Sequence, residues 1–337
     1  MLKKKNKYNV AVMGATGAVG VTFLQILEER NFPIADIRLL ASERSVGKKI
    51  KFKNKEYPVE QLTHSSFAGI DIVLSSAGAS RSLEFLPSAV KAGAICVDNS
   101  SAFRMQSDIP LVVPEVNPHQ IKNNRGIIAN PNCSTIQMVV ALWPIHKIAK
   151  IKRIVVSTYQ SVSGAGQKKI SELKQQTSEF LNERKITIKE FSYQIAFNLI
   201  PQIDVFTESG YTKEEIKMVN ETKKIMEDES IAVSATCVRV PVLYAHSESV
   251  NIETEKRVTR NQAIEILKSA KGIKVIDDVN NLKYPMPIDA QFKDDVFVGR
   301  IREDSSISNG LNLWVVSDNL RKGAALNAIQ IAEELIK

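Results

Sequence analysis

A glycine-rich turn near the start of the chain is the feature that most constrains the fold. It has the sequence GATGAVG, from Gly14 to Gly20, and lies between an apolar strand pattern at 9–13 and a helix pattern at 19–30. Such a turn lets backbone N–H groups approach a pyrophosphate, and the N-terminus of the next helix favours negative charge. The context predicts dinucleotide binding. Because the spacing is G-x-x-G-x-x-G rather than the commoner G-x-G-x-x-G, a purely structural turn is the alternative.

The order of apolar patterns predicts an α/β fold of two domains. In the first 130 residues, helix patterns alternate with short strand patterns at 9–13, 37–41, 70–75, 94–98 and 111–113. This alternation is typical of a mostly parallel, Rossmann-type sheet with crossover helices.

The pattern changes at about residue 151. Longer runs of alternating polarity favour an α+β domain with a mixed or antiparallel sheet that is covered on one face. Helix patterns occur at 167–184, 213–229 and 323–336, and we expect the last to return to the first domain. The predicted division is 1–132 with 319–337 for the dinucleotide-binding domain, and 133–318 for the second domain.

Composition narrows the class of protein. The chain has 337 residues, of which 44% are hydrophobic and 24% charged, and this excludes a disordered, fibrous or small disulfide-stapled protein. Three widely spaced cysteines favour a reducing, cytoplasmic location. No apolar run is long enough to span a membrane, and glycines interrupt the one that follows the N-terminal lysines. The net charge of +8 suits anionic small molecules but does not identify a nucleic-acid binder.

The segment NPNCSTIQM places Cys133 after a turn and directly before a helix pattern. A cysteine at a helix N-terminus has a lowered thiol pKa, and the thiolate is the nucleophile. Cys96 and Cys237 lie in apolar strand patterns, where we expect inert core residues. The sequence therefore favours Cys133 as a catalytic nucleophile.

A nucleophilic thiol needs a base, and His246 is the best placed of the four histidines. It lies in VPVLYAHSESVNIE, at a predicted bend between two strands, where loops present functional groups. A structural or surface role is the alternative for each histidine. No cluster of His, Cys or Asp has metal-ligand spacing, so we expect no metal site.

The end of the second predicted strand bears on the choice of dinucleotide. Ser42, Arg44 and Ser45 offer hydroxyls and a guanidinium that suit the 2′-phosphate of NADP, whereas Glu43 would suit the ribose of NAD. A solvated loop is the third alternative.

Further charged residues are candidates for substrate contacts. Arg104 follows a strand pattern, and Arg239 lies within an apolar strand, where a charge needs a partner. Thr212 and Glu215 form a capping box at the start of the second long helix. On that helix Glu214 and Lys217 share a face with Glu221 and Lys224, so a solvated ion-pair face is the alternative to a binding role.

Taken in order, GATGAVG, NPNCSTIQ, YQSVSGAG and the RVPV…HSES segment resemble the aspartate-semialdehyde dehydrogenases. The resemblance covers nearly the whole chain. It implies an NADP-dependent oxidoreductase that converts aspartyl phosphate to aspartate semialdehyde and inorganic phosphate through a cysteine thioester. The implied pathway is the biosynthesis of lysine through diaminopimelate, and of threonine, methionine and isoleucine. The second domain would be catalytic and dimerising, giving a homodimer or homotetramer.

The resemblance also implies roles for individual residues. Cys133 would be the nucleophile, His246 the acid and base, and Gln160 the residue that orients the reacting group. The substrate and phosphate residues would be Arg104, Asn132, Glu214, Lys217 and Arg239. The NADP(H) residues would be Gly14, Thr16, Gly17, Ala18, Val19, Ser42, Arg44, Ser45, Ser76, Ser163, Gly164 and Asn319.

Three alternatives stay open at this stage. One is an N-acetyl-glutamyl-phosphate reductase-like enzyme, although the HPGCYPT motif usual in that family is missing. The second is a non-catalytic nucleotide-binding regulator. The third is another thiol-dependent aldehyde dehydrogenase, for example one that acts on a sugar phosphate.

Overall fold

The computed structural model describes residues 2–337 and divides them into two compact units. The first unit contains the residues up to Asn132 together with Ala324–Lys337, and the second is Cys133–Gly323. The sequence-based division began the returning segment at Asn319. The structure groups Asn319 with the second unit, where its side-chain oxygen accepts hydrogen bonds from the hydroxyls of Ser161 and Ser163.

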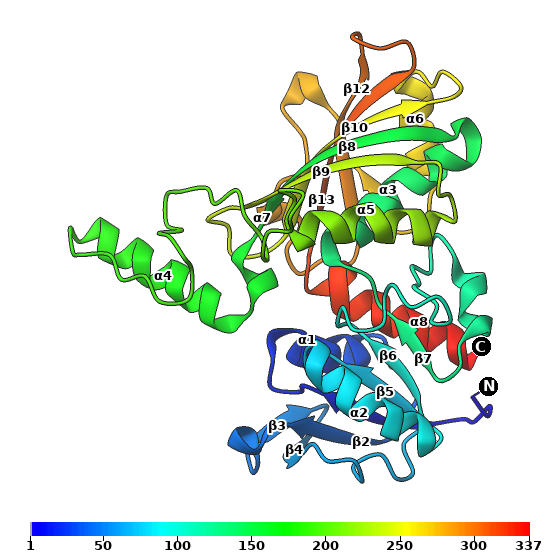
Figure 1. The fold of residues 1–337 in the computed structure, drawn as a ribbon, viewed down its shortest axis with the longest axis vertical. Coiled ribbons are helices and arrows are strands. Elements are labelled where there is room, and N and C mark those ends of the chain that lie inside the picture. The colour runs from blue at the N-terminus through cyan, green and yellow to red at the C-terminus, as the bar shows by residue number, and fades with distance from the viewer. Residues whose placement is uncertain (1) are drawn as a thin grey trace. The chain divides into compact units, whose positions relative to one another are not determined.

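A seven-stranded sheet forms the centre of the first unit, in the order β3-β4-β2-β1-β5-β6-β7 (Figure 1). Its strands pair in parallel except for β3, which runs antiparallel to β4. The central strand β1 is almost wholly buried, as expected for a parallel strand with both faces covered. The strands are β1 (Tyr8–Met13), β2 (Ile34–Ala41), β3 (Lys49–Phe52), β4 (Lys55–Gln61), β5 (Ile72–Ser75), β6 (Ile95–Asp98) and β7 (Ile127–Ala129).

Helices α1 (Ala18–Glu29) and α8 (Leu326–Ile336) contact each other and contribute to the main core of this unit. Helix α2 (Ala79–Lys91) packs against β6. The C-terminal helix therefore returns to the sheet of the first unit, as predicted, and its red ribbon lies beside the cyan strands in Figure 1.

The predicted strand at 111–113 is wrong. Only Leu111 forms a bridge, to Ala129, and the strand that completes this edge is β7. A three-residue apolar run specifies burial but not a ladder partner, and all three residues are indeed buried in the core.

A six-stranded mixed sheet forms the second unit, in the order β11-β12-β13-β10-β8-β9, as expected from the alternating patterns. The pairs β8/β9 and β11/β12 are parallel, and the other pairs are antiparallel. The strands are β8 (Ile151–Gln160), β9 (Ala232–Arg239), β10 (His246–Thr254), β11 (Ile273–Val275), β12 (Val296–Asp304) and β13 (Gly310–Ser317).

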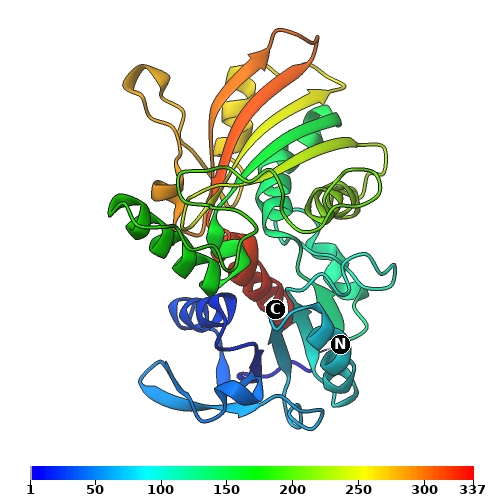
Figure 2. The same ribbon diagram turned by 60° about the vertical axis from the view of Figure 1, so that its left-hand side comes forward.

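One face of this sheet is covered by α3 (Cys133–Ala149), α5 (Lys213–Met226) and α6 (Arg260–Lys268), which also contact one another through α3. Along β8 the buried side chains alternate with exposed ones, so the other face is open. Helix α4 (Gln167–Leu181) and the segment after it project from the sheet, as both views show (Figure 1, Figure 2). Across residues 2–337, no helix has the length and apolar character that a bilayer crossing needs.

Candidate active site

Three strand ends bring candidate residues together at one edge of the second-unit sheet. Gln160 ends β8 and Arg239 ends β9, and the parallel register pairs these two residues directly. His246 begins β10, which runs antiparallel to β8 with Ser247 opposite Tyr159. The side chains of Gln160, Arg239 and His246 are all buried on the helix-covered face. His246 lies in the strand itself, not at a bend between strands as the sequence suggested.

Cys133 is the first residue of α3, as the sequence predicted, and is partly exposed, whereas Cys96 and Cys237 are fully buried. Burial raises the pKa of both buried thiols far above the ordinary range, so neither forms a thiolate at neutral pH. Arg239 and Cys133 attract each other electrostatically. The helix N-terminus and this guanidinium together favour the thiolate form of Cys133.

Ser161 fixes the orientation of the His246 ring. The backbone N–H of Ser161 donates to Nδ1 at 3.0 Å, and the Ser161 hydroxyl lies at the same distance from Nδ1. A backbone N–H can only donate, so Nδ1 carries a lone pair and the neutral ring holds its proton on Nε2. Burial, and secondly the positive charge of Arg239, place the pKa of His246 well below its usual value. The ring is therefore neutral at pH 7, with Nε2–H as its donor.

Gly164 lies against this ring, and a side chain at this position would crowd it. A Cβ at this position would be 3.1 Å from His246 Nε2 and 3.4 Å from Arg239 Nη1. The glycine therefore allows the loop after β8 to approach both residues closely.

Arg239 has the partner that its apolar surroundings require. Its Nη1 donates to the carbonyl oxygen of Ser161 at 2.7 Å, and its charge interacts with Glu214. Burial lowers the pKa of the guanidinium, and the negative charge of Glu214 acts against this effect. A fork of N–H donors held at the sheet edge is suited to a carboxylate.

A chain of polar side chains leads from Gln160 to the surface. The Gln160 amide donates to Glu214 at 3.1 Å, and Lys217 donates to Glu214 at 3.2 Å and to Asp204 at 2.8 Å. Burial by itself would lower the pKa of Lys217, but Glu214 and Asp204 outweigh it and the pKa is raised. Lys217 is thus a fixed cation near the reactive edge.

The alternative of a solvated ion-pair face on α5 is wrong, because Glu214 and Glu221 are 6% and 1% exposed. The capping box of Thr212 and Glu215 is present as predicted. The N-terminal turn of α5 is therefore held rigidly where Glu214 and Lys217 emerge.

The glycine turn of the first unit has the close backbone approaches that a nucleotide-binding turn needs. Gly14 has φ +85°, and a Cβ there would lie 2.6 Å from the Ser76 carbonyl oxygen. A Cβ on Gly20 would lie 2.2 Å from the Gly14 carbonyl oxygen. Gly17 is the N-cap of α1, with Thr16 exposed before it and Ala18 and Val19 in the first turn.

The loop after β2 lies beside this turn. It forms a short 3-10 helix, η1 (Glu43–Ser45), and the Ser45 hydroxyl is 3.5 Å from that of Thr16. Ser42, Glu43 and Arg44 are exposed. The arrangement suits the adenosine end of a dinucleotide whose pyrophosphate lies at the start of α1.

The remaining candidates occur on both units. Arg104 is buried in the first unit, where it donates to the carbonyl oxygens of Asn99 and Asn130, each at 2.9 Å. Asn132 is buried directly before α3. Ser163 and Asn319 are joined by a hydrogen bond of 3.1 Å in the second unit.

Sequence reasoning did not identify Ser161 or Asp204, which orient His246 and Lys217. Both act through contacts between segments distant in sequence, and no local pattern marks them. In the part of the chain that the structure describes, no group of three or more His, Cys, Asp or Glu could hold a metal ion.

Comparison with known proteins places this chain in a family. Residues 9–124 match the family model "Semialdehyde dehydrogenase, NAD binding domain", and residues 142–322 match "Semialdehyde dehydrogenase, dimerisation domain". The chain is 60% identical to the aspartate-semialdehyde dehydrogenase of Aquifex aeolicus, over 98% of each protein. It is 53% identical to that of Bacillus subtilis, over 98% of this chain and 97% of the relative.

Solved structures agree with the sequence matches. The chain is similar to aspartate semialdehyde dehydrogenase II from Vibrio cholerae complexed with ASA, with a TM-score of 0.96, 52% identity, and coverage of 98% and 99%. It is also similar to the NADP complex of the Candida albicans enzyme, with a TM-score of 0.76, 27% identity, and coverage of 98% of each chain.

Cys133 should be the only thiol of the folded protein that reacts quickly with a small alkylating agent at neutral pH. It combines partial exposure with a helix N-terminus and Arg239, whereas burial keeps Cys96 and Cys237 protonated. Peptide mass spectrometry after brief labelling measures this, and labelling in denaturant is the control in which all three react. Equal labelling of Cys96 or Cys237 in the folded protein would remove the special status of Cys133.

Proposed function

Because the chain belongs to the aspartate-semialdehyde dehydrogenase family, we propose that it catalyses the NADPH-dependent reductive dephosphorylation of L-aspartyl-4-phosphate to L-aspartate 4-semialdehyde. The observation that carries this proposal is the meeting of Gln160, Arg239 and His246 at one sheet edge, with Arg239 attracted to the thiol of Cys133. These groups supply a nucleophile, a proton donor and a carboxylate clamp.

The reaction begins at Cys133. Its thiolate attacks the acyl carbon of the aspartyl phosphate, the C–O bond to phosphate breaks, and inorganic phosphate leaves with the bond electrons. Bound NADPH supplies the hydride that reduces the resulting thioester. His246 donates its Nε2–H proton to the substrate oxygen as the hydride adds, while Nδ1 keeps its hydrogen bond from the Ser161 backbone N–H. The C–S bond of the resulting hemithioacetal then breaks, the proton returns to Nε2, and the aldehyde and the Cys133 thiolate are released.

Arg239 binds the α-carboxylate of the substrate, and Glu214 lies near its α-amino group. Gln160, held by Glu214, orients the reacting group. Arg104 and Asn132 of the first unit and Lys217 of the second are the residues assigned to phosphate, and their cations would stabilise the leaving group.

The residues proposed for NADP lie on both units. The turn from Gly14 to Val19 fits the pyrophosphate, because Thr16 and Gly17 are exposed at the N-terminus of α1. The Ser42, Arg44 and Ser45 loop fits the 2′-phosphate, and Ser76, whose carbonyl is beside Gly14, belongs to the same site. On the second unit, Ser163, Gly164 and Asn319 are the assigned residues.

The proposal is tested by phosphate-dependent reduction of NADP with aspartate semialdehyde. N-acetyl-glutamate semialdehyde and a sugar-phosphate aldehyde are the competing substrates. Turnover that requires phosphate and favours aspartate semialdehyde supports the proposal. Preference for a competitor would reassign the substrate, and NADP binding without turnover would favour a regulator.

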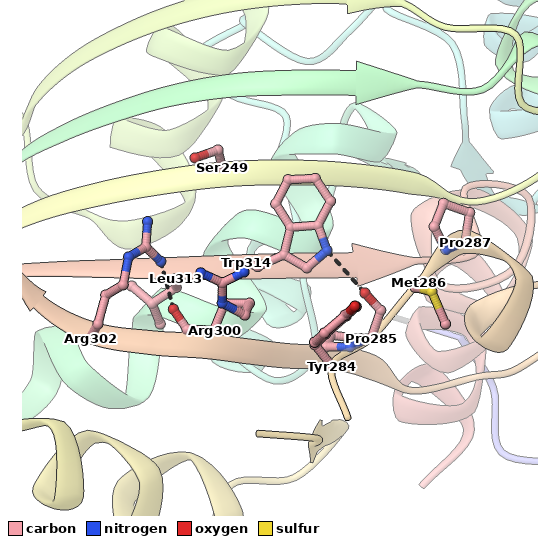
Figure 3. A pocket seen from close by; sticks show the side chains of 9 residues that line it. All are labelled: Ser249, Tyr284, Pro285, Met286, Pro287, Arg300, Arg302, Leu313 and Trp314. Atoms are coloured by element: carbon pink, nitrogen blue, oxygen red, sulfur yellow. Dashed lines mark hydrogen bonds between the residues drawn. The ribbon is translucent and has the colours of Figure 1, made fainter. Parts of the chain in front are cut away.

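We also propose that the open face of the second-unit sheet pairs with a second copy of the chain, giving a homodimer. The family model that covers this unit is described as a dimerisation domain. The face carries the rings of Tyr159 and Trp314, whose centroids are 5.5 Å apart. A pocket beside them is lined by Tyr284, Pro285, Met286, Pro287, Arg300, Arg302, Leu313 and Ser249 (Figure 3).

Trp314→Glu should convert the dimer to a monomer, because it replaces the ring that packs on Tyr159 by a charge. The dissociation constant should rise at least about 100-fold, the scale of an interface hot spot. Sedimentation equilibrium measures this, with circular dichroism to confirm folding. Lys51→Glu, on β3 of the first unit, is the control. A folded variant that stays dimeric would place the interface elsewhere, and a tetrameric parent protein would require a second contact.

Arg44→Ala should weaken NADP binding by roughly 1.5–3 kcal/mol, the range for a hydrogen bond to a charged group. NAD binding should be nearly unchanged, because NAD lacks the 2′-phosphate. Fluorescence titration with both cofactors measures the difference, and Lys48→Ala is the neighbouring control. An equal loss for both cofactors would exclude Arg44 from the 2′-phosphate site.

Lys217→Ala should raise the KM for phosphate by about tenfold, as expected for one lost charge-assisted contact, and change the KM for the aldehyde less. Arg239→Lys should do the reverse, because an ammonium group cannot form the bidentate fork. Steady-state kinetics in the oxidative direction measure both values, with Lys213→Ala on the same helix as the control. If both substitutions changed both KM values alike, the two sub-sites would not be separate.

A further inference from the structure

Glu248 is a buried carboxyl group directly behind the candidate active site. It lies two residues after His246 on β10, so both side chains point to the helix-covered face. Its side chain is 0% exposed. Among the residues that the structure describes, neither carboxyl oxygen has a hydrogen-bond partner of normal geometry.

The neighbouring strands offer Glu248 no cation. Across the ladders it faces Thr158 on β8 and Val315 on β13. The Thr158 hydroxyl donates to Gln160 at 3.0 Å. The charge of Glu248 contributes to the raised pKa of Cys237 on β9, but this thiol provides no positive charge.

The charged groups further along these elements do not neutralise Glu248 either. Arg239, at the end of β9, interacts with Glu214 and Cys133. Glu214 and Glu215, on α5, are themselves acidic. An ionised carboxylate here would be buried without an opposite charge, which is strongly unfavourable. Burial accordingly raises the pKa of Glu248 well above its usual value.

Gln137 on α3 is the side chain that interacts with the Glu248 carboxyl, and this interaction by itself lowers the pKa of Glu248, but burial has the larger effect. It is fully buried, its Oε1 has no partner among the described residues, and its Nε2 lies 3.5 Å from the His246 carbonyl oxygen, at the outer limit of a hydrogen bond. Gln137 follows Cys133 by four residues, so the two lie on the same face of α3. It therefore links the helix that carries the thiol to the strand that carries the imidazole.

We propose that Glu248 is a positioning residue that acts as a neutral carboxylic acid: its O–H donates to Gln137 Oε1, and the Gln137 amide holds the His246 backbone. This connection fixes the start of β10 against the start of α3, and with it the separation of His246 from Cys133. The protonated acid supplies the donor that Gln137 Oε1 lacks, and an ionised Glu248 would remove it. The catalytic part of this inference rests on the proposed function.

The first test replaces the acid by its neutral analogue. Glu248→Gln should keep kcat within about twofold of the parent, because an amide also donates. Glu248→Leu should lower kcat by about 10- to 100-fold, the scale for a small displacement of a catalytic group, with the KM for NADP unchanged. Glu229→Gln, at an exposed position between α5 and β9 of the same unit, is the control. The proposal would be overturned if Glu248→Gln lowered kcat as much as Glu248→Leu does. It would also be overturned if Glu248→Leu kept the kcat of the parent.

The second test asks whether the effect passes through Gln137. Gln137→Met should resemble Glu248→Leu, and the double variant should be no worse than either single one, because each breaks the same connection. Additive losses in kcat would overturn the connection between the two residues.

The third test needs no catalytic activity. A carboxyl whose pKa is raised on folding contributes stability below its unfolded pKa and loses it as the pH rises toward the folded value. As the pH rises above about 4.3, the ordinary pKa of a glutamate, the folding equilibrium constant of the parent protein should therefore fall relative to that of Glu248→Gln, by up to about tenfold per pH unit. Urea unfolding measures this ratio. A constant ratio would show that Glu248 holds no proton in the folded state and would overturn the proposal, even if Glu248→Leu failed to fold.

If the parent protein lacked activity with aspartate semialdehyde, only the proposed function would fail.

Discussion

The register between β8, β9 and β10 is the constraint on which the candidate active site depends. Parallel pairing sets Gln160 beside Arg239, and antiparallel pairing brings His246 to the same edge of the sheet. Because side chains alternate along a strand, a shift of one residue in β10 would turn His246 to the open face. The backbone hydrogen bonds of the sheet thus position the side chains with a precision that loops alone would not supply.

The arrangement of the polar groups at this edge reduces the free-energy cost of burying them. The charges of Arg239, Glu214 and Lys217 alternate in sign, and each is hydrogen-bonded, so their mutual attraction compensates for lost hydration. His246 and Glu248 lack an opposite charge and are instead driven to their neutral forms. The same helix-covered face therefore provides fixed charges at some positions and neutral hydrogen-bonding groups at others.

The sequence predicted correctly those features that depend on residues close together in the chain. The glycine turn and the helix start at Cys133 are each specified within a few residues, and the two-domain α/β architecture followed from the periodicity of the apolar patterns. The contact between Ser161 and His246 could not be derived in this way, because it depends on which distant strands pair. The strand predicted at 111–113 failed for the same reason. The assignments of individual residues to substrate and cofactor stay predictions.

The contact between Ser161 and His246 also has a consequence for how the chain acquires activity during folding. Helix α3 can form from local interactions, so Cys133 can reach its helix terminus early. His246 reaches its contact with Ser161 only when β8 and β10 have paired. Pairing between distant segments is slow, because the intervening loop must close first. In a refolding protein, helical signal should therefore return before catalytic competence, and the delay between them reports the completion of the mixed sheet.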